Sequence, residues 1–430
     1  MNRRTFLEKT GNTALGLSAL PLLSAISFEP KYRLALIGCG WWGMNICREA
    51  LAEGSSKLIA ICDVDQRTLK TVQEEINQLS GQKPKPYTDY REMLTKEKPE
   101  IVIVATPDHW HALPALMAME LGAHVYIEKP IGHTINEGKA LLQVARKYDR
   151  VAQVGFHRRV SAHHLSAMEF LKSGKAGHVS SVKAFVNYGG GPGKPEPEEK
   201  IPEGLDWDMW CGPAPYRPYH AGIHPRGFRN YLDYANGTIA DWGIHWFDQI
   251  LWWTEERYPK TIFSSGGKFV KKDNTDAPDT QLAIYEFESF VLQWESKLAT
   301  MNANENTLVG CYFYGTEGTL HLGFQDGWTF YPSKKDKEKI HFDSKLNQPD
   351  DQNIKELWAD LLQAIQQKRR PTADIEHGYL ATNISLLGVI SYKLGRSLRW
   401  DGEKGQILDD PEANALLSRE YRKPWEYPKF

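Results

Sequence analysis

Short apolar runs alternate with amphipathic segments through the first third of the chain. The run at 34–37 is followed by helical spacing of Met44, Ile46 and Cys47. Further apolar runs, with helical segments between them, lie at 58–62, 101–105, 124–127 and 151–154. Strands that alternate with helices are typical of a parallel, doubly wound sheet. We therefore predict an α/β Rossmann domain over residues 31–155.

The remaining chain, residues 156–430, shows a different pattern, in which apolar and polar positions alternate among aromatic and β-branched residues. Segments of this kind lie at 178–189, 260–270, 280–297, 307–324 and 327–334. Period-two alternation predicts antiparallel strands with one covered face. Two helical runs follow, around 354–367 and 377–394. This part is predicted to be an α+β domain with a large, mostly antiparallel open sheet.

One segment in this second part, 189–237, is far longer than an ordinary loop. It lies between a predicted strand and the helix that carries candidate catalytic residues. Two interpretations stay open: a lid over a cleft, or a packed surface wrap. A lid would be lined by Tyr219, His220, His224, Arg226 and Arg229.

The N-terminal segment, residues 1–27, is not expected to belong to the fold. It carries the pair Arg3 and Arg4, then a weakly apolar run that is too short and too rich in Gly, Ser and Thr to span a bilayer comfortably. The segment resembles a twin-arginine export signal, with Ala25 and Ser27 suited to cleavage after Ser27. The alternatives are a disordered basic tail and a retained anchor. Export of this type carries folded proteins, so we expect a periplasmic protein with no transmembrane segment.

Charge and cysteine content exclude some classes of protein. The 52 basic and 54 acidic residues leave no charge excess that points to nucleic acid or an anionic membrane. Five cysteines are an odd number, and we expect core residues rather than a disulfide framework. Most of the 14 tryptophans are expected in the core, and a minority would suit a carbohydrate-facing wall.

A glycine-rich turn follows the first apolar run. Gly38, Gly40 and Gly43 lie between a predicted strand and a predicted helix, which is the context that gives this weak spacing meaning. Backbone N–H groups and the positive helix end at such a turn bind a pyrophosphate. The predicted cofactor contacts are Gly38, Gly40, Trp41, Trp42, Gly43 and Met44. The alternative is a glycine turn in a nucleotide-free α/β domain.

Asp63 lies near the end of the second strand segment, 25 residues after Gly38. A carboxylate in this position accepts hydrogen bonds from adenosine ribose hydroxyls and repels a 2′-phosphate. No arginine immediately follows it. We therefore predict NAD rather than NADP as the cofactor.

Polar residues also follow the next two apolar runs, in "ATPDHWH" and "EKP". Ligands of a doubly wound sheet lie at the carboxyl ends of its strands, so these residues are expected near a nicotinamide. The predicted contacts are Thr106, Pro107, His109, His111, Glu128 and Lys129. His109 with His111, and His163 with His164, also raise the question of a metal. No third ligand stands at a familiar spacing, so we predict no metal.

The stretch "DWGIHWFD" carries the candidate catalytic residues. Asp241, His245 and Asp248 are spaced i, i+4 and i+7, which predicts one helical face. A histidine flanked by carboxylates is held in one tautomer and is a better base. We predict that His245 takes a hydroxyl proton, that Asp241 orients it and that Lys129 polarises or shares the proton. The alternative for His245 is a buried structural histidine, and Asp248 is expected to cap or orient.

Three further residues are candidates for substrate binding, beside His245. His157 and Arg158 follow the last strand of the first domain and are expected to emerge over the cleft. Arg229 lies in the long segment described above. These side chains suit substrate hydroxyls, and the alternative for the pair is simple solvation.

Gly38-x-Gly-x-x-Gly43, "ATPDHWH", "EKP" and "DWGIHWFD" in this order resemble the glucose–fructose oxidoreductase, inositol dehydrogenase and rhizopine-catabolism (Gfo/Idh/MocA) family. The resemblance covers nearly the whole chain after residue 30. It implies a nucleotide domain followed by an open-sheet domain that binds substrate and pairs subunits, as a homodimer or homotetramer. It also implies hydride transfer on a sugar or polyol, with Lys129, Asp241 and His245 in the catalytic roles given above.

The expected location bears on the reaction, because a periplasm holds no pool of free NAD. An NAD-dependent sugar or glycoside oxidoreductase with a tightly held cofactor is the favoured interpretation. The first alternative is a redox-neutral glycoside hydrolase or lyase that passes through a transient keto-sugar. The second is a non-enzymatic NAD or sugar sensor, against which the set Lys129, Asp241 and His245 argues.

Overall fold

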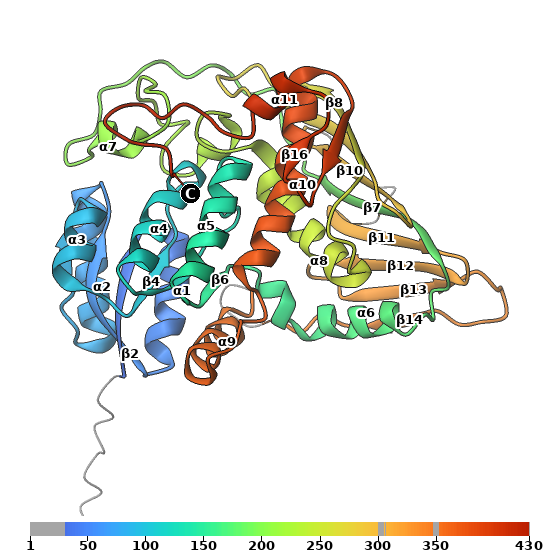
Figure 1. The fold of residues 1–430 in the computed structure, drawn as a ribbon, viewed down its shortest axis with the longest axis horizontal. Helices are drawn as coiled ribbons and strands as arrows, with labels where there is room; N and C mark the ends of the chain where they lie inside the picture. Colours follow the sequence, from blue (N-terminus) through green and yellow to red (C-terminus); the bar gives the residue numbers. More distant parts are fainter. Residues whose placement is uncertain (1–30, 300–304, 306, 347–351, 430) are drawn as a thin grey trace, which may run out of the picture.

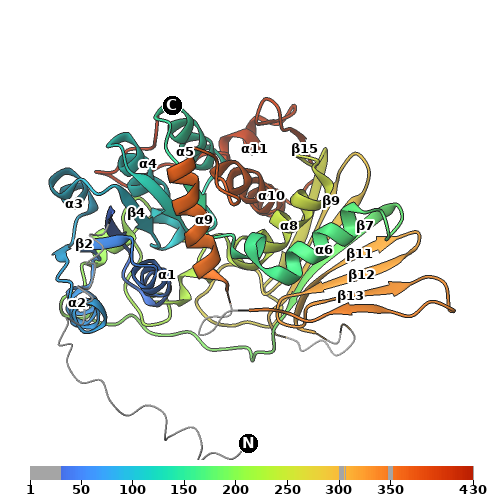
Figure 2. The ribbon, with the colours of Figure 1, turned by 90° about the horizontal axis from the view of Figure 1, so that it is seen from below.

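The computed structural model describes residues 31–429 apart from 300–304, 306 and 347–351. The predicted export signal, residues 1–27, lies outside the described residues. Two sheets stand side by side, with helices between them (Figures 1 and 2). The first sheet has six strands and the second has ten.

The six-stranded sheet is parallel, in the order β3-β2-β1-β4-β5-β6. Its strands are β1 (Tyr32–Ile37), β2 (Ser56–Cys62), β3 (Lys85–Tyr87), β4 (Ile101–Val104), β5 (His124–Ile127) and β6 (Ala152–Val154). The helices that connect them are α1 (Trp41–Ala52), α2 (Gln66–Ser80), α3 (Tyr90–Glu97), α4 (Ala112–Glu120) and α5 (Ile135–Lys147). The apolar runs form β1, β2, β4, β5 and β6 because they are largely buried on both faces, whereas the short edge strand β3 is mostly exposed. The predicted Rossmann architecture is confirmed, and its strand order reverses between β1 and β4.

The ten-stranded sheet has the order β14-β13-β12-β11-β7-β10-β9-β8-β15-β16. The strands are β7 (Val179–Asn187), β8 (Thr261–Gly267), β9 (Thr280–Glu286), β10 (Val291–Lys297), β11 (Val309–Gly315), β12 (Gly318–Gly323), β13 (Trp328–Pro332), β14 (Ile340–Phe342), β15 (Leu398–Asp401) and β16 (Gln406–Ile407). β7 and β10 pair in parallel, and the other described neighbours pair antiparallel. The predicted, mostly antiparallel open sheet is confirmed.

Helices of the second part of the chain lie on one face of this sheet or against the first domain. They are α6 (Ala162–Lys172), α8 (Ile244–Thr254), α9 (Ile354–Gln367), α10 (Ile375–Leu394) and the short α7 (Trp207–Cys211) and α11 (Pro411–Ala415). α10 contacts α5 and β6 on one side and α8 and β8 on the other, so it joins the two domains. α9 packs on α1 of the Rossmann domain. α8 is thereby held beside the carboxyl ends of the first sheet.

The long segment between β7 and α8 is packed against its own aromatic residues. Trp207 and Trp210 stack with ring centroids 4.4 Å apart, and Tyr219, Phe228 and Tyr234 are buried with them. The segment also pairs with the Rossmann domain, where Leu205 forms an isolated bridge with Asp65. Of the two interpretations, the packed wrap describes this part of the structure.

Two observations concern the whole of the described chain. The five cysteines are buried and free of disulfides. Among the described helices, none combines the length and apolar character needed to span a bilayer.

Candidate active site

The glycine turn between β1 and α1 is shaped by close backbone contacts. Gly38 has φ +89°, and a Cβ there would lie 2.5 Å from the carbonyl oxygen of Ala105. A Cβ on Gly43 would lie 2.1 Å from the carbonyl oxygen of Gly38. Only glycine allows this turn to pack against β4 and the start of α1.

Gly40 differs from these two glycines, because a Cβ at Gly40 would meet no atom within 4 Å. It is also the residue before α1, and no side chain caps that helix. The first-turn N–H groups of a helix lack intrahelical partners and favour an anion. An open space next to uncapped N–H groups fits the pyrophosphate of a dinucleotide.

The other predicted contacts in this turn lie at different depths. Trp41 is 58% exposed, and the guanidinium of Arg226 lies 5.3 Å from the centre of its ring. Trp42 is half-buried and contacts the ring of His157, with ring centroids 6.0 Å apart. Met44 is buried in the core, so it supports the turn from behind rather than facing the open side.

Asp63 joins the glycine turn to β2. Its Oδ2 accepts a hydrogen bond from the N–H of Cys39 at 2.8 Å, and its Oδ1 accepts one from the N–H of Asp65 at 3.0 Å. Burial raises the pKa of Asp63 to about 6. This half-buried carboxylate has no ion-pair partner among the described residues, and it keeps acceptor capacity for a ribose.

Two buried carboxyl groups lie at the strand ends where a nicotinamide is expected. Glu128 accepts hydrogen bonds from Trp42 and from the N–H of Lys129, and burial raises its pKa to about 7. Burial also raises the pKa of Asp108 to about 7, against the lowering effect of Arg229 and Lys129. Thr106 and Pro107 lie in the same turn, and the Thr106 hydroxyl is buried without a hydrogen-bond partner in the described chain.

The two histidines predicted as cofactor contacts are occupied elsewhere. The Nε2 of His109 lies 2.9 Å from the carbonyl oxygen of Trp210, and its Nδ1 lies 3.2 Å from that of Tyr234. The Nε2 of His111 lies 2.8 Å from the carbonyl oxygen of Thr106, and its Nδ1 contacts that of Pro130. These partners give both histidines a structural role, and their contact with the cofactor stays a prediction. His109 anchors the long segment, and His111 ties two strand-end turns together.

Lys129 and Asp241 meet across the two domains. The Nζ of Lys129 donates to Oδ1 of Asp241 at 2.8 Å and to its carbonyl oxygen at 2.7 Å. The Nε of Arg229 donates to the same Oδ1 at 3.3 Å. These two cations hold the pKa of Asp241 below its usual range despite the raising effect of burial. The structure thus brings together three predicted site residues from distant segments.

His245 lies one turn further along, at the start of α8. Asp241 belongs to a π-helical turn, Ile239–Gly243, that leads into α8. His245 is buried, and its Nδ1 has no hydrogen-bond partner in the described chain. Burial, with Lys129 and Arg158 nearby, lowers the pKa of His245 well below its usual value. The imidazole is therefore neutral at physiological pH and has a free ring nitrogen.

Neither of the two carboxylates predicted to orient His245 is hydrogen-bonded to it among the described residues: Asp241 binds Lys129 and Arg229, and Asp248 binds Arg159. Both oxygens of Asp248 accept hydrogen bonds from Nε of Arg159, at 2.8 and 2.9 Å, and the pair is buried. The wider π-turn changes the angle between Asp241 and the residues that follow it. Asp248 therefore anchors the turn 157–160 on α8, and Asp241 anchors Lys129.

The predicted substrate residues His157 and Arg158 lie beside His245. The rings of His157 and His245 have centroids 5.2 Å apart. His157 Nδ1, both ring nitrogens of His164, and Nε and Nη1 of Arg158 are buried without a hydrogen-bond partner among the described residues. Buried polar atoms are nearly always paired, so this group of unpaired atoms marks a place for bound water or ligand. We call His157, Arg158, His164 and His245 the inner cluster.

Only one of the five residues proposed for a lid reaches this region. Arg229 contacts Asp241, as described above. Arg226 covers Trp41 of the glycine turn. The others pack within the long segment: His224 against Trp207 and Trp210, Tyr219 against Trp207, and His220 beside Tyr231.

Two aromatic residues of the site were missed in the sequence. The ring of Trp242 lies edge-on to His245, with centroids 6.4 Å apart, and Tyr188 contacts Trp242 at 5.6 Å. Tyr188 directly follows β7, and Trp242 lies in the sequence between Asp241 of the π-turn and His245 of α8. A position at the end of a strand was the only signal for Tyr188.

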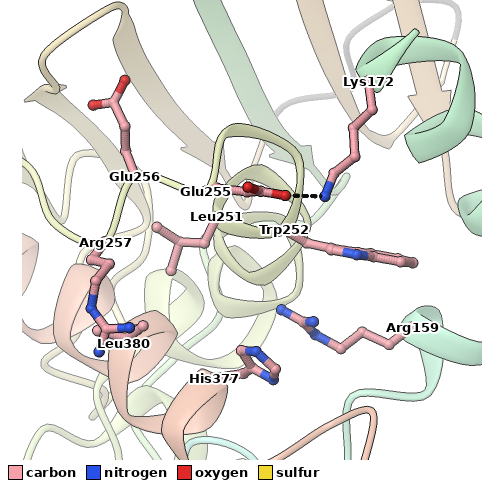
Figure 3. Close-up of a pocket in the computed structure, with 9 residues that line it drawn as sticks. All are labelled: Arg159, Lys172, Leu251, Trp252, Glu255, Glu256, Arg257, His377 and Leu380. Carbon is pink, nitrogen blue, oxygen red and sulfur yellow. Dashed lines mark hydrogen bonds and ion pairs between the residues drawn. The ribbon is translucent and has the colours of Figure 1, made fainter.

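A separate cavity of about 240 Å³ lies at the other end of α8 (Figure 3). It is lined by Arg159, Lys172, Leu251, Trp252, Glu255, Glu256, Arg257, His377 and Leu380. Each of its three cations has a carboxylate partner: Asp248, Glu255 and Glu376 respectively for Arg159, Lys172 and Arg257. We call it the outer pocket. Its three cations are all paired, and Nδ1 of His377 is a ring nitrogen there that has no hydrogen-bond partner among the described residues.

The histidine pairs are not part of a metal site in the described residues. His163 and His164 lie with ring centroids 4.0 Å apart in α6. Within the part of the chain that the structure describes, no group of three or more His, Cys, Asp or Glu side chains is arranged to hold a metal ion.

Comparisons with known proteins agree with this geometry. Residues 32–156 match the Gfo/Idh/MocA model described as oxidoreductase family, NAD-binding Rossmann fold. Residues 185–427 match the model described as oxidoreductase family, C-terminal alpha/beta domain. Together the two models cover both sheets.

Curated relatives match over a part of their length. The chain is 27% identical over 203 residues to the alpha-N-acetylgalactosaminidase of Shewanella oneidensis. It is 26% identical over 202 residues to a glycosyl hydrolase family 109 protein of Shewanella pealeana. Each match spans 42% of this chain and 44% of the relative, so the chain covers less than half the length of these proteins.

A solved structure shares the fold over most of the chain. The aldose-aldose oxidoreductase of Caulobacter crescentus, complexed with glycerol, superposes with a TM-score of 0.65 at 18% identity, over 86% of this chain and 100% of that one.

Proposed function

The chain belongs to the Gfo/Idh/MocA family of NAD-binding oxidoreductases, and we propose that it oxidises a ring hydroxyl of a sugar, glycoside or polyol with a tightly held NAD. One observation carries the proposal. A neutral, buried His245 with a free ring nitrogen lies beside the Lys129–Asp241 pair at the carboxyl ends of the Rossmann strands. Oxidation of an alcohol needs a group of this kind to take the hydroxyl proton.

Each residue of the site has a separate role in the proposed reaction. His245 takes the proton of the hydroxyl group, because its imidazole is neutral before the reaction. Lys129 uses two N–H groups on Asp241, so a third remains for the hydroxyl oxygen. Asp241 holds Lys129 in place and is itself held by Arg229. NAD, when bound along the glycine turn and Asp63, supplies the acceptor for the hydride.

We also propose export to the periplasm by the twin-arginine route, on the grounds of Arg3, Arg4 and the weakly apolar run after them. In that compartment released NADH could not be replaced. A held cofactor requires a second substrate, a carbonyl compound that takes the hydride back. Electrons then balance over the cycle, since one sugar is oxidised and one carbonyl compound is reduced.

A second candidate function is redox-neutral cleavage of a glycoside. Its support is the similarity to relatives named as family 109 glycosyl hydrolases and an alpha-N-acetylgalactosaminidase. In this route a hydroxyl is oxidised, the neighbouring C–H loses its proton, the glycosidic group leaves as an alcohol, water adds to the resulting double bond and the hydride returns to the keto group. Asp108 and Glu128, each with a pKa of about 7, are carboxyl groups that exchange protons near neutral pH.

We further propose a homodimer or homotetramer built on the uncovered face of the ten-stranded sheet. Along β9 every second side chain is exposed, with Leu282 at 45% and Ile284 at 48%. Phe263, Val291, Tyr314 and Tyr331 are large exposed side chains of other strands of this sheet. A single face with this many apolar side chains is typical of an interface. Light scattering that shows only a monomer at micromolar concentration would contradict it.

Product analysis tests the proposed reaction. Purified protein with its cofactor is incubated with a panel of free sugars, polyols and glycosides, and the products are identified by mass spectrometry. A loss of two hydrogens from one compound, matched by a gain in another, supports the oxidoreductase. Release of an intact sugar from a glycoside, with no net oxidation, supports the second function. If no compound of the panel is converted although the protein binds NAD, the result would favour a non-enzymatic sensor.

A further inference from the structure

Arg158 is a buried cation without a counter-ion. The residue is 3% exposed, and its guanidinium makes no ion pair or hydrogen bond with any described residue. Its Nε and Nη1 are sealed from solvent without a partner, whereas the third nitrogen, Nη2, is not among the sealed atoms. Burial lowers the pKa of Arg158 to about 9, so the group still carries its charge at neutral pH. A lone buried charge costs a protein stability unless something binds to it.

Its neighbour Arg159 shows that the fold supplies partners elsewhere in the same turn. Arg159 is equally buried and holds both oxygens of Asp248. Asp248 is also the carboxylate that acts on Arg158 through space, but its oxygens are already taken. Arg158 therefore lacks a counter-ion although its neighbour in the same turn has one.

The position of Arg158 puts this charge next to the reacting group. Its guanidinium lies 4.1 Å from the centre of the Trp246 ring, and Trp246 directly follows His245. Its chain neighbour His157 contacts His245 as described above. The other members of the inner cluster are neutral, because burial and Arg158 lower the pKa of His157, His164 and His245 well below the usual value. The inner cluster therefore has one uncompensated positive charge.

We propose that Arg158 binds a singly charged anionic substituent, a carboxylate or a sulfate ester, on the sugar whose hydroxyl faces His245. The inference rests on the proposed function and narrows its substrate class to acidic sugars. A guanidinium matches the planar pair of oxygens in a carboxylate. The unpaired ring nitrogens of His157 and His164 provide further polar contacts for such a group. One uncompensated charge fits a monoanion better than a phosphate dianion.

The test compares matched acidic and neutral sugars on the NAD-loaded protein. The pairs are glucuronate with glucose and galacturonate with galactose, and glucose 6-sulfate separates sulfate from carboxylate. Binding is measured by calorimetry and hydride transfer by nicotinamide absorbance. Wild-type protein should bind at least one acidic sugar about 30-fold or more tightly than its neutral counterpart, as expected for a buried charge pair. Arg158→Gln should reduce that preference to less than about threefold.

Two further variants separate charge from folding. Arg158→Lys keeps a point charge without the guanidinium fork and should retain part of the preference. Arg159→Lys is the matched control in the same turn, and it should leave the acidic-to-neutral ratio unchanged. Circular dichroism and NAD affinity, measured for each variant, show whether the fold and the cofactor site are intact.

The outcomes are distinct. Equal binding of acidic and neutral sugars by the wild type, or no binding of any acidic sugar, overturns the inference without need of a variant. A preference that survives Arg158→Gln also overturns it, and a simultaneous loss of NAD affinity would assign Arg158 to the nicotinamide. A preference that depends on Arg158 but comes with no hydride transfer supports the inference and contradicts the proposed function.

Discussion

The two ends of helix α8 both gather polar side chains, which are buried at the inner cluster and largely exposed at the outer pocket, and the two ends differ in how those side chains are paired. At the outer pocket every cation has a carboxylate partner, and Arg159 shares two oxygens of Asp248. At the inner cluster one cation and several ring nitrogens have no partner among the described residues. The outer pocket has an unpartnered ring nitrogen, Nδ1 of His377, but no unpaired cation, whereas the inner cluster combines an unpaired cation with several unpartnered ring nitrogens.

The difference indicates where to look for function in a fold of this kind. Paired buried charges hold elements together, because each satisfies the other. Unpaired ones cost stability and persist where a ligand completes them. We therefore assign structure to the outer pocket and chemistry to the inner cluster, and the following changes test that division.

Loss of the imidazole of His245 should have the largest effect. His245→Ala removes the proton acceptor, and general-base catalysis contributes ~10²–10⁴-fold to turnover. NAD affinity should stay close to that of the wild type, because the glycine turn and Asp63 are untouched. Nicotinamide absorbance with an active sugar and calorimetry with NAD measure the two quantities. His377→Ala is the matched control, since it removes an imidazole from the outer pocket. Wild-type hydride transfer in His245→Ala would exclude His245 as the base and leave Lys129.

Lys129→Ala should reduce turnover by a comparable ~10²–10⁴-fold, because the hydroxyl oxygen loses its donor and Asp241 loses its partner. Residues that act as one unit are strongly non-additive. The double variant with His245→Ala should therefore be scarcely slower than either single variant. Lys172→Ala, in the outer pocket, is the control and should keep full activity. Multiplied effects in the double variant would show that the two residues act independently.

The two neighbouring arginines should respond differently to loss of charge. Arg159→Met leaves the buried Asp248 without its ion partner, which costs ~3–5 kcal/mol of unfolding free energy. Arg158→Met removes a buried charge that has no partner, so it should cost much less. Urea denaturation of the two variants, followed by circular dichroism, measures both. Equal losses would contradict the view that Arg158 is unpaired in the folded protein.

The smallest expected effect concerns Asp63, a half-buried carboxyl group without an ion partner among the described residues. Because the pKa of Asp63 is raised to about 6 in the folded protein, its protonated form contributes to folding stability at low pH. This contribution to the free energy of unfolding is lost as pH rises through 6. Only the ionised form accepts both ribose hydroxyls, so NAD affinity should fall by at most ~10-fold per pH unit below that value. Calorimetric titration with NAD between about pH 5 and pH 8 measures this dependence of NAD affinity on pH. Asp63→Asn should remove this dependence, and an unchanged slope in that variant would assign it to another group.

Much of the fold could be predicted because it depends on local pattern. The apolar run at 307–324 contains β11 and β12, and the helical runs near 354 and 377 match α9 and α10. The parallel pairing of β7 with β10 could not be predicted, because the two strands are separated by the long segment and α8. The π-turn before α8 was also missed, since the spacing of Asp241 and His245 is equally compatible with a regular helix.

The sequence by itself determined the glycine turn, Asp63 and the placement of Lys129, Asp241 and His245 at the ends of their elements. These features depend on backbone conformation and on spacing within one segment, both of which are local. Only the tertiary structure decided which side chains are paired. In the folded chain Asp248 pairs with Arg159, and the rings of His109 and His111 contact backbone carbonyls. Arg158 and one ring nitrogen of His245 have no partner among the described residues. Pairing depends on which segments, far apart in the chain, pack together in the fold. The periodicity of the sequence is local and contains no information about these contacts.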